Sequence, residues 1–322
     1  MTAAGGESSS GGGPVPSGAP PPRSVTVRVP ATSANLGPGF DCLAVTLDLW
    51  NEATLTLAGD GVVLSVEGEG RGALPTDAGN LVARAALALL DELDEAPRGL
   101  QITCRNGIPL GSGLGSSAAA VLAGMLGVNA LLGGRLDAAG LLERAAAREG
   151  HADNVAAALF GGLVVVAAEG DRLVYQVYEL PRLPVAVVVP EMYYSTRAAR
   201  AVLPRQVPLA DAVFNMGRTA LVVDALRRGD LDLLGRVMED RLHQPHRLAL
   251  IKGAAGALAA ARTAGAAAVT LSGSGPGLIA FAGEADAAEL GRVMVEALAA
   301  EGVTARALIL TVSTQRATVV ND

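Results

Sequence analysis

Hydrophobic and polar positions alternate in the first hydrophobic stretch of the chain. In residues 24–31 (SVTVRVPA), the alternation puts Val25, Val27 and Val29 on one face, which predicts a β-strand. The same period of two recurs over residues 49–70, in LWNEATLTLAG and GVVLSVEGEG. The glycine-containing break between these two segments predicts that they pair as a hairpin.

Three segments of the first half have the longer period of a helix. Residues 80–93 (NLVARAALALLDEL) are amphipathic, and Asn80 stands where an N-cap belongs. Residues 116–133 (SSAAAVLAGMLGVNALLG) are apolar on nearly every face, which predicts a helix buried between layers. A third helix over residues 136–150 should end at Gly150. We expect the next segment, HADNVAAALFGGLVVVAAEG, to form a turn and then a strand.

In the second half, strand-like and helical segments are interleaved. Strands are predicted at 183–191 and 305–313, and residues 266–283 read as strand, glycine turn and strand. Helical patterns occupy residues 196–204, 211–230, 231–243, 253–265 and 286–302. This arrangement predicts an α+β fold with strands on one side and helices on the other.

Composition divides the chain into three parts. Residues 1–22 consist mainly of Gly, Ser, Pro and Ala and carry a single charged side chain, which predicts a disordered tail. A charged segment near residues 175–183 interrupts the pattern and suggests a boundary. We therefore expect an N-terminal lobe at 23–179 and a C-terminal lobe at 180–322.

Charge and hydropathy exclude several classes of function. The 322 residues carry a net charge of −7 and no basic stripe, so we expect no nucleic-acid partner. Charged residues, Gly or Pro interrupt every apolar run before it could span a membrane, and there is no signal-peptide pattern. Cys42 and Cys104 have no metal or redox spacing. We therefore expect a cytoplasmic protein without a membrane partner.

The candidate chemistry begins with GIPLGSGLGSSAAAVLAG, residues 107–124. This stretch follows a predicted strand and contains five glycines and three serines. Glycines let the backbone approach a ligand closely, and the free N–H groups at the start of a helix favour phosphate. Lys252 is the only lysine and lies in neither a Walker A loop nor a kinase strand motif. Backbone N–H groups would therefore have to bind most of a triphosphate.

Residues 109–119, PLGSGLGSSAA, resemble the P-x-x-x-G-L-G-S-S-A-A motif of the GHMP kinase superfamily. Blocks near both ends of the chain, VRVPATSANLGPGFDCLAVTLDLWNEATL and TLSGSGPGLIAF, are similar to the flanking motifs of that superfamily and occur in the same order. The resemblance implies two α+β lobes with the active site between them. The N-terminal lobe would be ribosomal protein S5 domain 2-like and bind ATP, and the C-terminal lobe would be ferredoxin-like.

Within the superfamily, the chain resembles the homoserine kinase family. The similar blocks are PATSANLGPGFDCLAVTLDL, EGHADNVAAALFGG, YYSTRAARAVLP and RLHQPHRLALIKG. The last block has Gln244 where the family more often has Glu. The resemblance implies phosphorylation of the L-homoserine hydroxyl by ATP with Mg²⁺, a step of threonine biosynthesis, by a homodimer.

The resemblance also assigns residues to roles. For ATP it implies Pro109, Leu110, Gly111, Ser112, Gly113, Leu114, Gly115, Ser116, Ser117, Ala118, Ala119, Gly273, Ser274 and Gly275. For the amino acid it implies Asn35, Asp41, His151, Asn154, Thr196, Arg200 and Arg247, with Arg200 and Arg247 on the carboxylate and Asp41 on the ammonium. Catalysis would depend on Asn154 and Arg200, and Mg²⁺ would bind Ser117 and Glu149.

Some assignments stay open at this point. Glu143 competes with Glu149 for the metal, and we favour a solvated helix charge for Glu143. Asp153 is a candidate base, although phosphoryl transfer needs mainly positioning and charge neutralisation. The pair His243 and His246 has metal-like spacing, but without a third ligand we expect histidines on a helix surface.

Two other functions are compatible with the motifs. One is a GHMP kinase acting on another small alcohol, such as mevalonate or galactose. The other is a ligand-binding member without catalysis, which Ser117 and Glu149 argue against.

Overall fold

The computed structural model describes residues 23–321 apart from 96–98, 171 and 193–194. The tail expected at residues 1–22 lies outside the described residues. The N-terminal half contains the strands β1 (Ser24–Ala34), β2 (Leu43–Thr56), β3 (Val62–Gly68), β4 (Leu100–Asn106), β5 (Leu163–Glu169) and β6 (Arg172–Tyr178). Its helices are α1 (Leu81–Glu92), α2 (Ser116–Leu131), α3 (Ala138–Glu149) and α4 (Asp153–Phe160).

The C-terminal half begins with β7 (Leu183–Pro190). Five helices follow: α5 (Thr196–Ala201), α6 (Leu209–Arg228), α7 (Leu231–Val237), α8 (Gln244–Leu248) and α9 (Ala254–Thr263). The chain then forms β8 (Ala268–Leu271), β9 (Leu278–Phe281), α10 (Ala287–Ala300), β10 (Ala305–Ser313) and β11 (Thr318–Asn321). No helix within the described ranges is long and apolar enough to cross a membrane.

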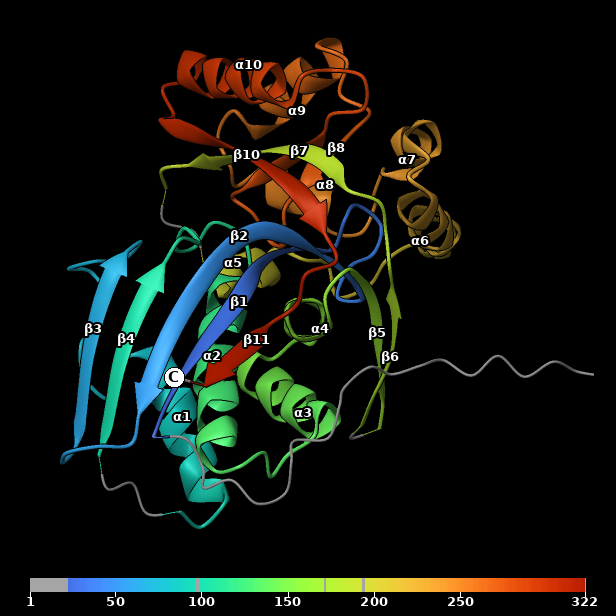
Figure 1. Ribbon diagram of the computed structural model, residues 1–322. Coiled ribbons are helices and arrows are strands. Elements are labelled where there is room, and N and C mark those ends of the chain that lie inside the picture. Colours follow the sequence, from blue (N-terminus) through green and yellow to red (C-terminus); the bar gives the residue numbers. More distant parts are fainter. Residues whose placement is uncertain (1–22, 96–98, 171, 193–194, 322) are drawn as a thin grey trace, which may run out of the picture.

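One hydrogen-bonded sheet runs through both halves of the molecule (Figure 1). Its main path is β11-β1-β2-β10-β7-β9-β8, and β4 and β5 pair with opposite ends of the long strand β2. The C-terminal part, β10-β7-β9-β8, is antiparallel and has the strand order of a ferredoxin-like sheet. The α+β prediction is confirmed, and so is the ferredoxin-like C-terminal lobe.

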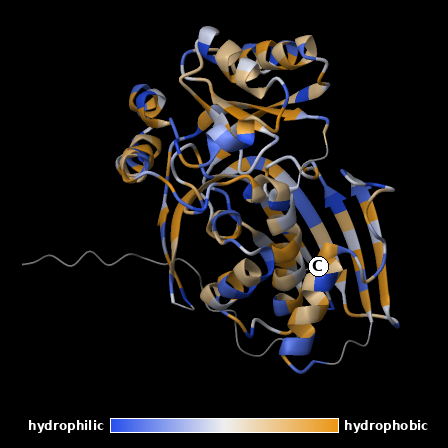
Figure 2. Ribbon diagram, turned by 180° about the vertical axis from the view of Figure 1, so that it is seen from behind, coloured by the Kyte–Doolittle hydropathy of each residue, from blue (hydrophilic) through white to orange (hydrophobic). Residues whose placement is uncertain are grey.

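The hairpin predicted over residues 49–70 is wrong, although both of its strands exist. β4 pairs antiparallel with β2, and β3 pairs parallel with β4, so β4 lies between the two expected partners. Figure 2 shows hydrophilic and hydrophobic residues alternating along β3 and β4. Most positions of β3 are exposed or half-buried, which suits an edge strand, whereas β4 alternates buried and exposed. Alternation identifies a strand but does not identify its neighbour.

Three elements were missed. Residues 172–178 form β6, which pairs antiparallel with β5, although we expected a charged boundary segment near there. Residues 153–160 form α4 where we expected a turn, because all but one of its residues are buried and the segment lacks an amphipathic period. The short strand β11 returns to the N-terminal half and pairs with β1. The helix predicted over residues 231–243 ends at Val237, and a separate short helix, α8, follows.

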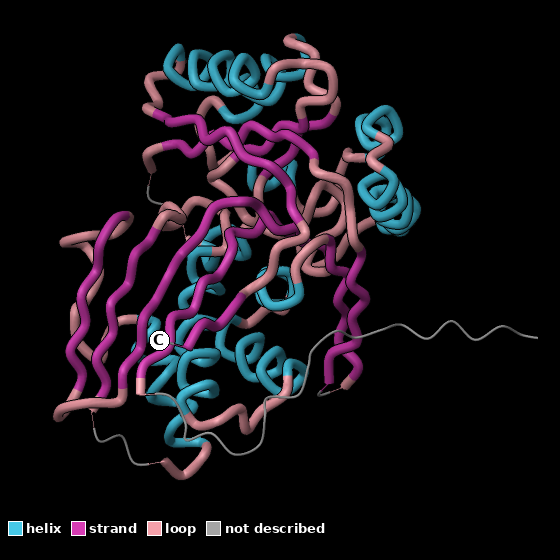
Figure 3. Tube along the Cα trace, viewed as in Figure 1, coloured by secondary structure: helices cyan, strands magenta, loops and turns pink. Residues whose placement is uncertain are grey.

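The core lies between the sheet and the helices. Figure 3 shows α1 to α4 between the main group of N-terminal strands and the β5–β6 hairpin. As predicted, α2 is buried on most sides, and the side chain of Asn80 caps α1 by accepting from the Val82 N–H. A second cluster of buried apolar residues lies beneath α9 and α10 against β7, β8 and β9. The site forms at the loop before α2, which contacts both halves: the Thr32 N–H of β1 donates to the Leu114 carbonyl at 3.1 Å, and the Ser272 hydroxyl, just after β8, donates to the Gly113 carbonyl at 2.8 Å.

The packing of α2 against α1 predicts whether a substitution at Gly124 stabilises or destabilises the protein. Replacing a glycine in a helix by alanine normally stabilises a protein by about 0.5–1 kcal/mol. A Cβ at Gly124 of α2 would lie 2.3 Å from the Val82 carbonyl oxygen of α1. We therefore expect Gly124→Ala to lower the free energy of unfolding by roughly 1–3 kcal/mol, measured by urea denaturation.

The matched control is Gly217→Ala. Gly217 lies inside α6, and a Cβ there would have no heavy atom within 4 Å. We expect this variant to be as stable as the wild type or more stable. If both variants are stabilised, α1 and α2 do not pack as described.

Candidate functional site

Two glycine turns, one from each half of the molecule, pack backbone against backbone. A Cβ at Gly113 would lie 2.2 Å from the Ser272 carbonyl oxygen, and one at Gly277 would lie 2.2 Å from the Ser112 carbonyl oxygen. The Gly277 N–H donates to that Ser112 carbonyl at 3.1 Å. No residue with a side chain fits at Gly113 or Gly277 without moving one turn away from the other.

The first of these turns leads into α2, and the backbone N–H groups at the start of α2 have no side-chain cap. Gly111, Gly113 and Gly115 have φ values of 60°, 77° and 69°, and Gly115 is the N-cap of α2 without a side-chain cap. The first N–H groups of α2 therefore remain available to an anion. Ser112 does not face such a ligand with its hydroxyl, because the Oγ donates to the Pro109 carbonyl at 2.7 Å.

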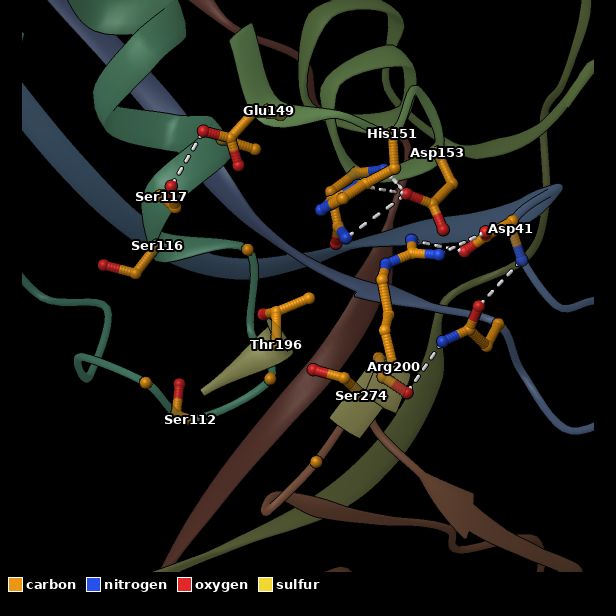
Figure 4. Close-up of a pocket in the computed structure, with 18 of the residues that line it drawn as sticks. Asp41, Ser112, Ser116, Ser117, Glu149, His151, Asp153, Thr196, Arg200 and Ser274 are labelled. Carbon is orange, nitrogen blue, oxygen red and sulfur yellow. Dashed lines mark hydrogen bonds and ion pairs between the residues drawn. The ribbon is translucent and has the colours of Figure 1, made fainter. Parts of the chain in front are cut away.

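A cavity of about 370 Å³ opens beside these turns. Most of the residues singled out in the sequence line it: Asn35, Asp41, Gly111, Ser112, Gly113, Gly115, Ser116, Ser117, Ala118, Glu149, His151, Asn154, Thr196, Arg200, Arg247, Gly273, Ser274 and Gly275. Figure 4 shows Ser117 and Glu149 on one side of this cavity and Asp41 with Arg200 on the other. Four predicted residues, Pro109, Leu110, Leu114 and Ala119, are not part of its lining. Leu114 and Ala119 are buried in the core.

The loop after β1 holds Asn35 and Asp41 in unusual conformations. Both have positive φ, 69° and 56°, which non-glycine residues adopt rarely and mostly where function requires it. The Asn35 amide donates to the Gly273 carbonyl at 2.7 Å and accepts from the Asp41 N–H at 2.9 Å. Asn35 thus connects the second glycine turn to Asp41.

Asp41 and Arg200 form a bidentate ion pair between the two halves of the molecule. The Arg200 guanidinium, carried by α5, donates to both carboxylate oxygens of Asp41 at 2.7 and 2.8 Å. This fork geometry is the strongest form of an arginine–carboxylate contact. Thr196 begins the same helix, so α5 delivers two of the predicted substrate residues to the cavity.

Arg247 reaches the cavity from α8 and is almost fully buried. Its guanidinium lies 5.0 Å from the centroid of the Phe40 ring, and the Arg200 guanidinium lies 5.6 Å from the same ring. Arg247 also donates to the Ala199 carbonyl at 3.3 Å and to His243 Nδ1 at 3.1 Å. Two cations thus converge on one aromatic ring at the end of the cavity that contains Asp41.

The expectation that His243 lies on a helix surface is wrong. Its side chain is fully buried, stacks on Phe40 and donates from Nε2 to the Gly37 carbonyl at 2.7 Å. Since Nδ1 accepts from Arg247, the ring is neutral, and burial lowers its pKa. No group of three metal-ligating side chains occurs in the part of the chain that the structure describes. His243 is therefore a support for Arg247, which the H-x-x-H spacing did not suggest.

Gln244 explains how α8 tolerates its departure from the family pattern. Its side-chain oxygen accepts from the Thr270 hydroxyl and the Leu271 N–H, both at 2.9 Å. An amide oxygen accepts these two hydrogen bonds as a carboxylate oxygen would, so the substitution keeps α8 fixed to β8.

Ser117 and Glu149 meet at the other end of the cavity. The Ser117 hydroxyl, in the first turn of α2, donates to Glu149 Oε1 at 2.7 Å. Burial raises the pKa of Glu149, partly offset by this hydrogen bond. Glu143, the competing carboxylate, lines a separate cavity of about 390 Å³ instead. A hydroxyl and a carboxylate are oxygen donors that suit Mg²⁺, and Glu149 is the acid placed to supply one.

His151, Asp153 and Asn154 form a network at the start of α4. Asp153 Oδ1 lies 2.8 Å from His151 Nδ1 and accepts from the Asn154 N–H at 2.7 Å. Burial alone would lower the pKa of His151, but the bond to Asp153 and the charges of Asp153 and Glu149 outweigh it and raise the pKa. Asn154 accepts from the Thr32 hydroxyl at 2.7 Å. Asp153 is thus occupied in positioning its two neighbours.

Three lining residues were not anticipated: Leu81, Arg84 and Arg148. Leu81 and Arg84 lie in the first turn of α1, and Arg148 lies in the last turn of α3. Each belongs to an amphipathic helix, where an arginine on the polar side is unremarkable. Only the meeting of α1, α2 and α3 at one end shows that these positions face the cavity.

Fold and site together define a class of small-molecule kinase with a glycine-rich loop at the start of a buried helix. The family model for the N-terminal domain of GHMP kinases matches residues 80–162, and the model for the GHMP kinase C-terminal domain matches residues 222–300. The chain therefore belongs to the GHMP kinases.

Individual relatives narrow this class to the homoserine kinase family. Homoserine kinase of Moorella thermoacetica is 48% identical over 278 residues, covering 86% of this chain and 93% of the relative. Homoserine kinase of Desulfitobacterium hafniense is 40% identical and is covered completely. The crystal structure of homoserine kinase from Cytophaga hutchinsonii superimposes with a TM-score of 0.82 at 35% identity, over 92% of this chain and 98% of that one. This chain is a member of that family.

The contact between the two glycine turns can be tested by adding a single methyl group, with a glycine-to-alanine substitution at Gly113. Both Gly113 and Gly133 have positive φ, but a Cβ at Gly133 would meet nothing within 4 Å. We expect Gly113→Ala to destabilise the protein by roughly 2 kcal/mol more than Gly133→Ala, because only the former separates the turns. Hydrogen exchange of the Gly277 amide should accelerate in Gly113→Ala alone. Equal exchange rates in both variants would contradict the contact.

Burial of neutral His243 predicts how stability varies with pH. Its folded-state pKa is lowered, so below its ordinary value of about 6.5 the unfolded chain binds a proton that the folded chain does not. The stability that depends on neutral His243 is complete above that pH and is lost as the pH falls below it. Between pH 7.5 and 5.5 we expect a loss of up to about 1.4 kcal/mol in the free energy of unfolding.

His243→Gln provides the control for this measurement, because His151, with its raised pKa, contributes in the opposite direction. The variant should be less stable at pH 7.5 but should lose less stability on acidification. A variant whose pH dependence matches that of the wild type would show that His243 does not cause it.

Proposed function

We propose that this protein transfers the γ-phosphoryl group of ATP to the hydroxyl of L-homoserine, a step of threonine biosynthesis. The observation that carries the proposal is the cavity itself. One end offers the free N–H groups of a glycine loop and helix, and the other offers paired charges from Asp41, Arg200 and Arg247. A phosphate donor and a small zwitterion therefore have separate places within one cavity of about 370 Å³.

The amino-acid end suits a substrate that carries both charges. In the free protein, Arg200 and Asp41 neutralise each other. A bound zwitterion can replace this contact, because its carboxylate can pair with the Arg200 guanidinium and its ammonium can pair with Asp41. Arg247 provides a second guanidinium beside Phe40. An uncharged sugar would have to separate the ion pair without replacing either charge, which disfavours it.

The nucleotide end has a place for each part of ATP. The triphosphate would lie along residues 111–118 at the start of α2. A neighbouring cavity of about 180 Å³ shares Leu81, Gly111, Ser116 and Ser117 with the main one and adds Leu110 and Asn106. We place the adenine ring there, which gives Leu110 a role although it does not line the main cavity. Mg²⁺ held by Ser117 and Glu149 would neutralise charge on the phosphates as they separate.

The chain contributes positioning and charge to the transfer step. Asn154 accepts from the Thr32 hydroxyl, and its N–H donates to Asp153. It lies among the proposed substrate residues and would orient the substrate hydroxyl toward the γ-phosphate. Arg200 would stabilise the negative charge on the group being transferred, once substrate has separated it from Asp41. Asp153 faces His151 and Asn154 and is nearly inaccessible, so we assign no carboxylate base.

A coupled assay of ADP release tests the proposal across substrates. With purified protein, ATP and Mg²⁺, we expect turnover with L-homoserine and at least 100-fold lower kcat/KM with mevalonate and galactose, because neither replaces both charges of the ion pair. Asp41→Asn should raise the KM for homoserine at least tenfold while leaving ATP affinity unchanged. Release of ADP with mevalonate or galactose alone would overturn the assignment, and no ADP with any of the three would indicate a binding protein.

A further inference from the structure

Arg84 and Arg148 are the two cations of the cavity that the proposed function leaves without a task. We propose that they bind the β-phosphate of ATP and of ADP, as a pair of guanidinium groups at the outer end of the cavity. The inference rests on the proposed function only in taking a nucleoside phosphate as the ligand. It concerns which side chains recognise that ligand.

The two arginines reach the nucleotide end from different helices. Arg84 lies in the first turn of α1, and Arg148 lies in the last turn of α3, next to Glu149. Both line the main cavity, as do Ser116 and Ser117 at the start of α2. Both also line a groove of about 650 Å³ whose other residues come from α1, α2 and α3. The arginines therefore stand where the main cavity opens into this groove.

The other charges of the cavity already have partners. Asp41 pairs with Arg200, Asp153 pairs with His151, and Glu149 accepts from Ser117. Among the residues that the structure describes, no ion pair involves Arg84 or Arg148. Arg144, one turn before Arg148 on α3, is instead paired with Glu92 of α1. The nucleotide end of the cavity thus has two exposed guanidinium groups without an ion-pair partner among the described residues.

A phosphate chain is the ligand that fits this pair. ATP carries about four negative charges and Mg²⁺ compensates only two of them, while the glycine loop supplies N–H groups but no lysine. A guanidinium can bind two phosphate oxygens at once, and two guanidinium groups from opposite sides can enclose one phosphate. The arginines supply the positive charge that a lysine provides in other phosphate loops.

Position within the cavity favours the β-phosphate over the γ-phosphate. The γ-phosphate must reach Asp41 and Arg200, which Figure 4 shows on the side of the cavity away from Ser117 and Glu149. The groove that Arg84 and Arg148 share contains none of the substrate residues. Because the β-phosphate stays on ADP, these contacts would be equal before and after transfer. They would therefore strengthen nucleotide binding without accelerating the chemical step.

Calorimetric titration of Arg84→Gln, Arg148→Gln and the double variant with ADP and with AMP, in the presence of Mg²⁺ and without homoserine, tests this. We expect the Kd for ADP to rise about 3- to 10-fold in each single variant and about 10- to 100-fold in the double variant. The Kd for AMP, which lacks the β-phosphate, should change less than about threefold. In steady state the KM for ATP should rise while kcat stays within about twofold of the wild type.

Arg262→Gln is the matched control, because Arg262 is an exposed arginine in the last turn of α9 and lines none of the cavities described above. This variant should bind ADP like the wild type. Unchanged ADP affinity in the double variant would overturn the proposal, as would equal losses for AMP and ADP or an equal loss in Arg262→Gln. A fall in kcat with unchanged ADP affinity would place the arginines on the γ-phosphate and contradict the assignment.

The same data separate this proposal from the proposed function. If the wild type binds ADP and the double variant does not, but homoserine gives no turnover, the arginine assignment stands and the substrate assignment fails. If homoserine is phosphorylated and the double variant binds ADP normally, the reverse holds. Thermal unfolding of each variant should match the wild type within about 2 °C, which shows that a lost affinity is not lost folding.

Discussion

The contact between two glycine turns determines where everything else in the site lies. Because Gly113 and Gly277 have no Cβ, the turn before α2 and the turn between β8 and β9 pack closely. The Ser272 carbonyl oxygen lies against Gly113, and the Ser112 carbonyl oxygen lies against Gly277. Helix α2 belongs to the N-terminal half and β8 to the C-terminal half, so this contact sets the distance between the two halves. Asn35 strengthens it by joining Gly273 to the loop that carries Asp41. The glycine loop before α2 and the Asp41–Arg200 pair are thus held at a fixed separation by main-chain atoms, which vary little when side chains change.

Within that frame, the polar groups of the cavity satisfy one another. Ser117 binds Glu149, Arg200 binds Asp41, and His151 binds Asp153. Removing one member of such a pair would leave the other charge unpaired inside the cavity, which is costly where the charge is buried, as at Asp153. A ligand that contacts Ser117, Glu149, Asp41 or Arg200 has to replace a partner in one of the first two pairs. Binding therefore gains less free energy than the contacts alone would suggest, while ligands that cannot replace both partners are rejected.

The sequence predicted what depends on local order and on motifs. Most of its strands and helices were recognised from periodicity, and most of the motif residues line one cavity, although Leu114 and Ala119 support the loop from the core. Strand neighbours could not be predicted, because β3 and β4 have similar alternation and only burial distinguishes the edge from the interior. His243 was misjudged because the pattern of α8 does not show that Phe40, from a distant loop, covers it. Arg84 and Arg148 were missed for the same reason, since only the packing of α1, α2 and α3 in the folded protein shows that these two side chains line the cavity.

The pairing of β11 with β1 has a consequence for how this chain folds during synthesis. Among the residues that the structure describes, these are the first and last strands in chain order, and they lie side by side in the sheet. A ribosome adds about 5 to 20 residues per second, so roughly 15 to 60 seconds separate their synthesis. During translation, one edge of β1 therefore stays unpaired and open to other nascent chains, even after the helices beside it have formed. Only the emergence of the last strand closes that edge.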